Sequence, residues 1–424
     1  MHSSSLEKFT VSLSSLAWQC ALAATALSIS PLAGAAESVE VIHWWTSGGE
    51  TAAVEKFKEA LGTKGVEWKD MAVGGGDNQR MLLKSRIGKG NPPDAAQVNA
   101  DVRAYASDRA KLANLDALAS REKWDSVLPE PVRRYVKMGG SSYVMVPVDV
   151  NRQNILWIST ASLKRIGAEA PPKTWDEFFA MADKARAAGM IPLAMAEDLW
   201  VSNFIYQVAY STMGPDTFRR AFHEGDEASM RSAGMLEAFK VVRKSRSYVD
   251  RGASTRKWNA ATQMVMQGKA FAQVMGDWAK GEFVRAGKKA NEDYVCAPVP
   301  GTANGYVFSS DAFVFFKQAK DSPSQLALAQ VLMDKEAQQA FNLLKGSVPV
   351  RTDADVSKFD DCGRRSYADF VAAGKSGSLA AAPSMVATPG RYAAWRDAFL
   401  AYWNDDAMTP QQGVDKLIAV TKAN

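Results

Sequence analysis

The chain has 424 residues, of which 47% are hydrophobic, and a formal net charge of +5. It is long and apolar enough to bury substantial cores, while basic residues scattered among acidic ones disfavour nucleic acid or an anionic membrane as a partner. Its histidines and cysteines have no spacing typical of a zinc or haem site, so a transition-metal enzyme is disfavoured and neither a metal nor a cofactor is expected.

Residues 1–36 have the pattern of an export signal. Lys8 precedes an apolar stretch over 16–27, and the small residues at 33–36 suit a signal peptidase. A membrane anchor is the alternative, but the stretch is short and no basic stop follows it. We therefore predict a cleaved signal peptide, a periplasmic location and a mature chain of about 388 residues, which suits two domains better than one core.

The mature chain begins with a predicted strand and helix. Residues 39–45 alternate in polarity and are rich in β-formers, and the pattern over 51–61 places Val54, Phe57 and Leu61 on one helical face. Signals of the same kind recur at a helix-opening capping box over 174–177, a short strand at 191–195, a strand at 312–316 and a helix start at 322–323. This alternation predicts an α/β fold with parallel sheets.

Three extended segments could carry the chain between two domains. They are residues 143–151, 305–311 and 346–351. No low-complexity linker and no repeat of solenoid length separates the two halves. Several crossings would form a hinge rather than a flexible tether.

Two adjacent tryptophans, Trp44 and Trp45, follow the first predicted strand. A pyranose ring has C–H patches on its faces and hydroxyls around its rim, so it is bound by aromatic planes together with planar or charged hydrogen-bonding groups. A tryptophan that ends a buried strand is about equally expected in a core, so both interpretations stay open for each member of the pair. Asp311 opens an apolar strand, where a carboxylate is costly unless it faces a cleft or a cation.

Five segments spread over the mature chain match one known pattern. They are residues 44–50, WWTSGGE; 74–77, GGGD; 90–97, GNPPDAAQ; 275–283, MGDWAKGEF; and 345–351, KGSVPVR. In these segments the chain resembles the periplasmic sugar-binding proteins of ABC transporters, family 1 of the extracellular solute-binding proteins, and within it the glucose-binding branch.

The resemblance implies a two-lobed periplasmic-binding-protein fold of type II, in which each lobe is a parallel-rich sheet flanked by helices and hinge segments join the lobes. The implied lobes are residues 37–149 with 310–350, and 150–309 with 351–424. The implied function is non-catalytic: a monomeric protein captures a monosaccharide, glucose or a related hexose, in the interlobe cleft. It then delivers the sugar to the permease subunits in the inner membrane.

The resemblance also implies the ligand contacts. Trp278 would stack against the sugar opposite the tryptophan pair, Asp311 would accept hydrogen bonds from hydroxyls, and Lys345 would donate to the rim. From its position alone, Lys345 would be a solvated lysine at a helix C-terminus. The full implied set is Trp44, Trp45, Gln97, Asn99, Asn151, Trp200, Trp278, Asp311, Lys345 and Ser384.

Three of these positions depart from the glucose-binding pattern. Relatives often carry a lysine near Asn99, and histidines where this chain has Asn151 and Ser384. An imidazole and an amide or hydroxyl satisfy different hydroxyl arrangements, so the identity of the sugar stays open although its class does not.

Cys296 and Cys362 are the cysteines that remain after signal cleavage, and an even pair in an oxidising compartment predicts one disulfide. Two buried free thiols are the alternative. The competing function is a secreted glycoside hydrolase, whose carboxylate pair would come from Glu197, Asp198, Asp277 and Asp311.

Overall fold

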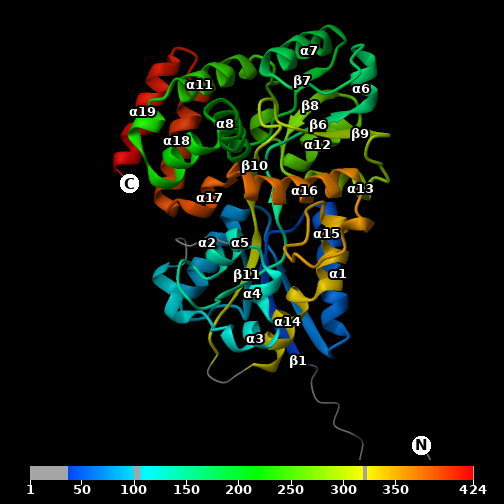
Figure 1. The fold of residues 1–424 in the computed structure, drawn as a ribbon, viewed down its shortest axis with the longest axis vertical. Helices are drawn as coiled ribbons and strands as arrows, with labels where there is room; N and C mark the ends of the chain where they lie inside the picture. The colour runs from blue at the N-terminus through cyan, green and yellow to red at the C-terminus, as the bar shows by residue number, and fades with distance from the viewer. Residues whose placement is uncertain (1–36, 100–105, 319–321, 424) are drawn as a thin grey trace, which may run out of the picture. The chain divides into compact units, whose positions relative to one another are not determined.

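Three sheets, of five, four and three strands, organise the residues that the computed structural model describes, which are 37–99, 106–318 and 322–423 (Figure 1). The predicted signal peptide, residues 1–36, lies outside them. We call the elements around the five-stranded sheet the first lobe and those around the four-stranded sheet the second lobe.

The first lobe is built on a sheet with the strand order β2-β1-β3-β11-β4. Its strands are β1 (Glu37–His43), β2 (Val66–Ala72), β3 (Ala95–Asn99), β4 (Met145–Pro147) and β11 (Asp311–Phe315). Its helices are α1 (Gly48–Gly62), α2 (Gly76–Gly88), α3 (Asp116–Arg121), α4 (Trp124–Val127), α5 (Glu130–Val136), α14 (Pro323–Met333) and α15 (Lys335–Lys345).

The second lobe is built on a sheet with the order β7-β8-β6-β9. Its strands are β6 (Ile155–Ser159), β7 (Ile191–Leu193), β8 (Ala270–Val274) and β9 (Tyr294–Pro298). Its helices are α6 (Thr160–Arg165), α7 (Trp175–Ala187), α8 (Asp198–Met213), α9 (Pro215–Arg219), α10 (Glu227–Met230), α11 (Ala233–Arg246), α12 (Trp258–Met266), α13 (Ala279–Arg285), α18 (Pro389–Asn404) and α19 (Pro410–Ala423).

The interior strand β6 of the second lobe is apolar over its first four residues, and both of its faces are covered. Successive side chains of a strand point to opposite faces. Leu156 and Ile158 of β6 accordingly pack into one apolar cluster, while Ile155 and Trp157 pack into another. The same two-sided burial explains why this strand shows no alternation in the sequence.

Local signals in the sequence position two helices as predicted. Thr174 and Glu177 form the predicted capping box at the start of α7, and Ser322 caps α14. Ser47 and Glu50 form a further capping box, which was not predicted, so α1 begins three residues before the predicted position 51. These contacts satisfy backbone N–H groups that have no partner inside the helix.

The prediction of a two-lobed α/β fold is confirmed, with sheets that are mixed rather than mainly parallel. In the first lobe β1 pairs in parallel with β2 and β3, whereas β11 is antiparallel to β3 and β4. In the second lobe β6 is antiparallel to β8 and β9, and only β7 and β8 pair in parallel. The reason is the connectivity: β6 and β11 enter their lobes from a crossing segment and therefore run opposite to strands that lead towards the hinge.

The segments that cross between the lobes are tied to one another. Val148 N donates to Asp311 O at 2.9 Å, and Val150 forms a β-bridge with Val348. The three-stranded sheet β12-β10-β5 lies beside them and contains β5 (Asn151–Arg152), β10 (Tyr306–Ser309) and β12 (Leu379–Ala381).

Two further helices, α16 (Asp361–Ser376) and α17 (Pro383–Val386), lie near the crossing segments, and α16 runs between the two lobes in Figure 1. Phe308 and Phe370, expected in the second lobe, pack into the apolar cluster of the first. The predicted lobe boundaries stay a prediction. Within 37–99, 106–318 and 322–423, no helix has the length and apolar character required to cross a membrane.

Candidate functional site

The turn that carries the tryptophan pair is held by a histidine that the sequence did not single out. His43 ends β1, where its Nδ1 accepts from Trp45 N at 3.2 Å while its Nε2 lies 2.6 Å from Asp70 Oδ1. These partners assign the ring proton to Nε2. Trp45 is 1% exposed and packs against Phe313 and Phe341, at ring-centroid distances of 5.6 and 4.9 Å. Trp45 therefore lies largely in the interior of the first lobe.

Trp44 is half-buried, and two glutamines hold the backbone beside it. Gln97 is fully buried in β3 and its Oε1 accepts from Trp44 N at 2.9 Å. Gln79 on α2 donates from Nε2 to Gln97 O at 2.9 Å. Gln79 was not among the site residues predicted from the sequence. The Arg80 guanidinium lies 5.7 Å from the centre of the Trp44 ring. Trp44 thus lies at the edge of the first lobe, whereas Gln97 lies in the interior and supports the Trp44 backbone.

A buried polar cluster brings four of the predicted ligand residues together. Lys345, the last residue of α15, is 2% exposed, and its Nζ lies 2.8 Å from Asn151 Oδ1, 3.1 Å from Asp149 Oδ2 and 3.2 Å from Asp311 Oδ2. Asn99 Nδ2 donates to Asp311 Oδ1 at 3.3 Å. The three N–H groups of the ammonium therefore face three protein oxygens.

Burial is the main cause of the raised carboxyl pKa values in and beside this cluster. Burial raises the pKa of Asp149 to about 8, against the opposing effect of the Lys345 cation. Burial disfavours the charged form of Lys345, but the carboxyl groups of Asp149 and Asp311 outweigh it and raise the lysine pKa above its usual range. Burial likewise raises the pKa of Glu50, at the start of α1, to about 7.

The predicted aromatics of the second lobe meet each other. The rings of Trp200 and Trp278 are 5.6 Å apart between centroids, and both side chains are half-buried. Ser384, half-buried in α17, forms no hydrogen bond with another predicted ligand residue within the described part of the chain. Trp278 and Trp45 belong to different apolar clusters, so no direct packing joins the two walls predicted for the cleft.

Among the described residues, two polar contacts between the lobes lie near the tryptophan pair. Gly49 N, in the first turn of α1, donates to Glu282 Oε1 of α13 at 2.8 Å. Asp77 of α2 accepts from Arg396 Nη1 of α18, also at 2.8 Å, and from Arg80 on its own helix. Because Arg80 lies beside Trp44, this second contact marks the edge of the region between the lobes.

Several buried polar atoms around this region have no hydrogen-bond partner within the described residues. They are Trp45 Nε1, Gln79 Oε1, Gln97 Nε2, Trp200 Nε1, Asp277 Oδ1 and Trp278 Nε1. Buried polar groups in proteins normally have partners, and this set contains both donors and acceptors. A ligand rich in hydroxyl groups, which donate and accept, matches such a set.

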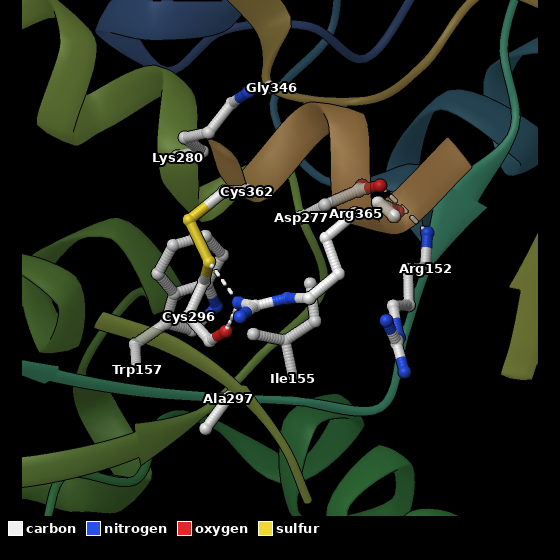
Figure 2. A pocket seen from close by; sticks show the side chains of 11 residues that line it. Arg152, Ile155, Trp157, Asp277, Lys280, Cys296, Ala297, Gly346, Cys362 and Arg365 are labelled. Carbon is white, nitrogen blue, oxygen red and sulfur yellow. Dashed lines mark hydrogen bonds between the residues drawn. A yellow bond between two sulfur atoms is a disulfide. The ribbon is translucent and has the colours of Figure 1, made fainter. Parts of the chain in front are cut away.

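The predicted disulfide is present and joins Cys296 of β9 to Cys362 of α16. Arg365 donates to the sulfur of Cys296 at 2.9 Å and to its carbonyl oxygen. The cavity beside them, shown in Figure 2, has a volume of about 10 Å³, room for one water molecule. It is therefore no ligand pocket.

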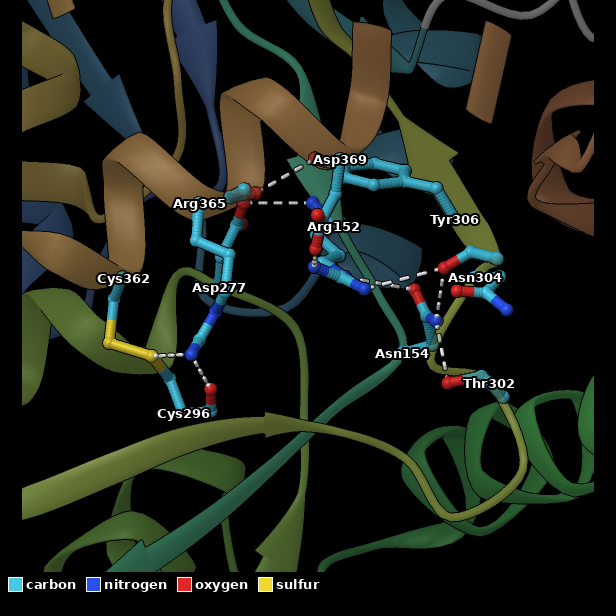
Figure 3. A network of polar contacts seen from close by, with 12 residues as sticks. Arg152, Asn154, Asp277, Cys296, Thr302, Asn304, Tyr306, Cys362, Arg365 and Asp369 are labelled. Atoms are coloured by element: carbon cyan, nitrogen blue, oxygen red, sulfur yellow. Dashed lines mark hydrogen bonds and ion pairs between the residues drawn. A yellow bond between two sulfur atoms is a disulfide. The ribbon is translucent and has the colours of Figure 1, made fainter. Parts of the chain in front are cut away.

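Asp277, a candidate acid of the hydrolase alternative, anchors a crossing segment instead (Figure 3). Its Oδ2 accepts from Arg152 N at 2.8 Å, and burial raises its pKa to about 7. The Arg152 guanidinium pairs with Asp369 of α16 at 2.5 Å and lies 4.9 Å from the centre of the Tyr306 ring. This network ties β5 to α16 and to the loop that precedes α13.

A larger groove, of about 370 Å³, lies between α5, α16 and the third crossing segment, and none of the predicted ligand residues lines it. Its lining includes Pro131, Pro349, Val350, Phe370 and Val371. Within the described ranges, no group of three or more His, Cys, Asp or Glu side chains is arranged to hold a metal ion.

Comparisons with known proteins agree on one family. The family model of bacterial extracellular solute-binding proteins matches residues 46–339. A probable sugar-binding periplasmic protein of Brucella suis biovar 1 is 42% identical over 366 residues, which cover 85% of this chain and 86% of the relative. One of the same description from Mesorhizobium japonicum is 39% identical over 93% of this chain and 96% of its own. The solved bacterial solute receptor AcbH shares the fold, with a TM-score of 0.74 at 17% identity over 92% of this chain and 97% of its own.

Proposed function

The chain belongs to the family of bacterial extracellular solute-binding proteins, and from that premise we propose that it is the periplasmic sugar-binding component of an ABC-type importer. The family is one of binding proteins and not of enzymes. The relatives described as sugar-binding and periplasmic support both the solute class and the compartment. The signal pattern over residues 1–36 supports export.

The observation that carries the proposal is the set of unpartnered buried polar atoms that both lobes contribute beside half-buried indoles. In the first lobe Gln79 Oε1 and Gln97 Nε2 have no hydrogen-bond partner within the described residues, and Gln97 holds the backbone of half-buried Trp44. An aromatic plane beside planar or charged hydrogen-bonding groups is the combination that a pyranose requires. The unpartnered indole N–H groups of Trp200 and Trp278 supply donors from the other lobe.

We propose a monosaccharide, glucose or a related hexose, as the ligand. Asp311 and Gln97 are almost fully enclosed by protein. The ion pair between Asp77 and Arg396 spans the lobes beside Trp44 and would obstruct a long oligosaccharide at that edge. A single ring bound between the lobes would bridge them, and the closed form would dock on the permease.

The test begins with a thermal-shift screen of monosaccharides and oligosaccharides, because a ligand that binds the folded state raises the melting temperature. Calorimetry with the best sugar then compares Trp278→Ala with wild type, and we expect at least a tenfold loss of affinity, about 1.4 kcal/mol. Trp175→Ala is the matched control: this half-buried tryptophan of the second lobe packs against Phe178 and Phe204. It should leave affinity within about twofold.

Each alternative has its own outcome. Unchanged affinity in Trp278→Ala would contradict the site, and stabilisation by amino acids or peptides but by no sugar would contradict the solute class. Sustained turnover of aryl glycosides would support the hydrolase instead.

A further inference from the structure

Asp149 joins the first and second crossing segments to Lys345, the residue directly before the third. It lies in the first segment and is fully buried. Its Oδ1 accepts from Asp311 N and from Asn151 Nδ2, each at 2.8 Å, and its Oδ2 accepts from Lys345 Nζ at 3.1 Å. Its carbonyl oxygen accepts from Ser310 Oγ at 2.6 Å. One carboxylate thus contacts three of the residues predicted to bind the ligand.

The same contacts leave Lys345 little capacity to bind a ligand directly. An ammonium group has three N–H donors, and here Asp149, Asn151 and Asp311 receive them. Asn151 is also engaged, because its Nδ2 donates to Asp149 while its Oδ1 accepts from Lys345, and its side chain is only 1% exposed.

Asp311 differs from these three. Its Oδ1 accepts from Asn99 and its Oδ2 pairs with Lys345, yet a carboxylate has about four acceptor positions and retains some of them for hydroxyl groups. Asp311 is 5% exposed, whereas Asp149 is 0% exposed. The cluster therefore has one member suited to contact a ligand, Asp311, and three suited to hold that member in place.

We propose that Asp149 and Lys345 act together as positioning residues, which fix the Asp311 carboxylate for the sugar and join the crossing segments, without touching the sugar themselves. This inference rests on the proposed sugar-binding function. It assigns to Lys345 a role different from the rim contact that the resemblance implies.

The test is a double-mutant cycle on sugar affinity, with Asp149→Asn, Lys345→Met and the double variant measured by calorimetry against wild type. Two residues that act through one another have non-additive effects. We expect each single variant to bind at least tenfold more weakly than wild type, and the double variant to bind no more than about threefold more weakly than the worse single variant. Asp149→Asn keeps the size of the side chain and is the variant more certain to fold.

The matched control is Asp360→Asn, because Asp360 also pairs with a buried lysine. Its Oδ1 accepts from Lys280 Nζ at 3.0 Å in the second lobe, and Lys280 is 2% exposed. We expect this variant to lower the melting temperature while leaving sugar affinity within about twofold of wild type. Loss of affinity would then report positioning and not general loss of stability.

The outcomes separate this inference from the function on which it rests. Wild-type affinity in Asp149→Asn would overturn the inference with the function intact. If Lys345→Met still bound at least tenfold more weakly in that case, Lys345 would contact the sugar directly. Multiplicative losses in the double variant would overturn it as well. A wild-type chain that no carbohydrate stabilises would overturn the proposed function and this inference with it.

Discussion

Glu50→Gln should change stability in opposite directions at low and high pH. Glu50 is 8% exposed at the start of α1, where Ser47 N donates to its Oε2 at 3.1 Å. Burial raises its pKa from 4.5 to about 7, although the Lys345 cation and the Ser47 hydrogen bonds oppose the shift. Glutamine keeps an oxygen that can accept from Ser47 and has no proton to lose.

The direction of the stability change follows because the pKa of Glu50 is higher in the folded chain than in the unfolded chain. Below about pH 4.5 the carboxyl is protonated in both the folded and the unfolded chain, and between about 4.5 and 7 the folded chain keeps a proton that the unfolded chain releases. The free energy of unfolding of wild type therefore falls as pH rises through this window. At about 1.36 kcal/mol per pH unit the loss is on the order of 3 kcal/mol. Asp149 and Asp277 contribute in the same direction, so only the difference between variant and wild type isolates Glu50.

Urea unfolding at pH 4.5 and pH 8.5, at constant ionic strength, measures this difference. We expect Glu50→Gln to be equal to or slightly less stable than wild type at the lower pH, and more stable at the higher pH by on the order of 2–3 kcal/mol. Glu59→Gln on the same helix is the control, because the Glu59 side chain is 62% exposed. Its difference from wild type should vary by less than about 0.5 kcal/mol between the two conditions. A Glu50→Gln difference that does not change with pH would refute the reasoning.

Two further changes test the packing at the hinge. Reduction of the disulfide between Cys296 and Cys362, which are 66 positions apart, should lower the free energy of unfolding by up to about 4 kcal/mol, and an unchanged urea midpoint with reductant would contradict this. Gly281→Ala should cost about 1–3 kcal/mol and separate α13 from α15, because a Cβ at Gly281 would lie 2.8 Å from Lys345 O. Gly374→Ala on α16 is the control, because no atom lies within 4 Å of the Cβ that this change adds. It should raise the free energy of unfolding by about 0.5–1 kcal/mol. Equal unfolding midpoints for the two variants would rule out a close contact at Gly281.

Local patterns in the sequence were sufficient for the class of fold and for several element boundaries. The predicted capping box at Thr174 acts over three residues, so its formation depends little on the rest of the chain. The even pair of cysteines was likewise enough to predict the disulfide, since these were the two cysteines left to pair. The direction of the strands was not available in this way, because it depends on which lobe the chain enters after each crossing.

The environment of the candidate residues was decided by the tertiary structure. Asp149 and Lys345 are 196 positions apart, and no periodicity places them in contact. The sequence likewise left open whether Trp45 lies in a core or a cleft wall, because that depends on Phe313 and Phe341, which come from distant elements. Composition and short motifs thus determined the family and the kind of ligand to expect, whereas the number of donors that Lys345 retains for that ligand depends on which oxygens the folded chain brings to it.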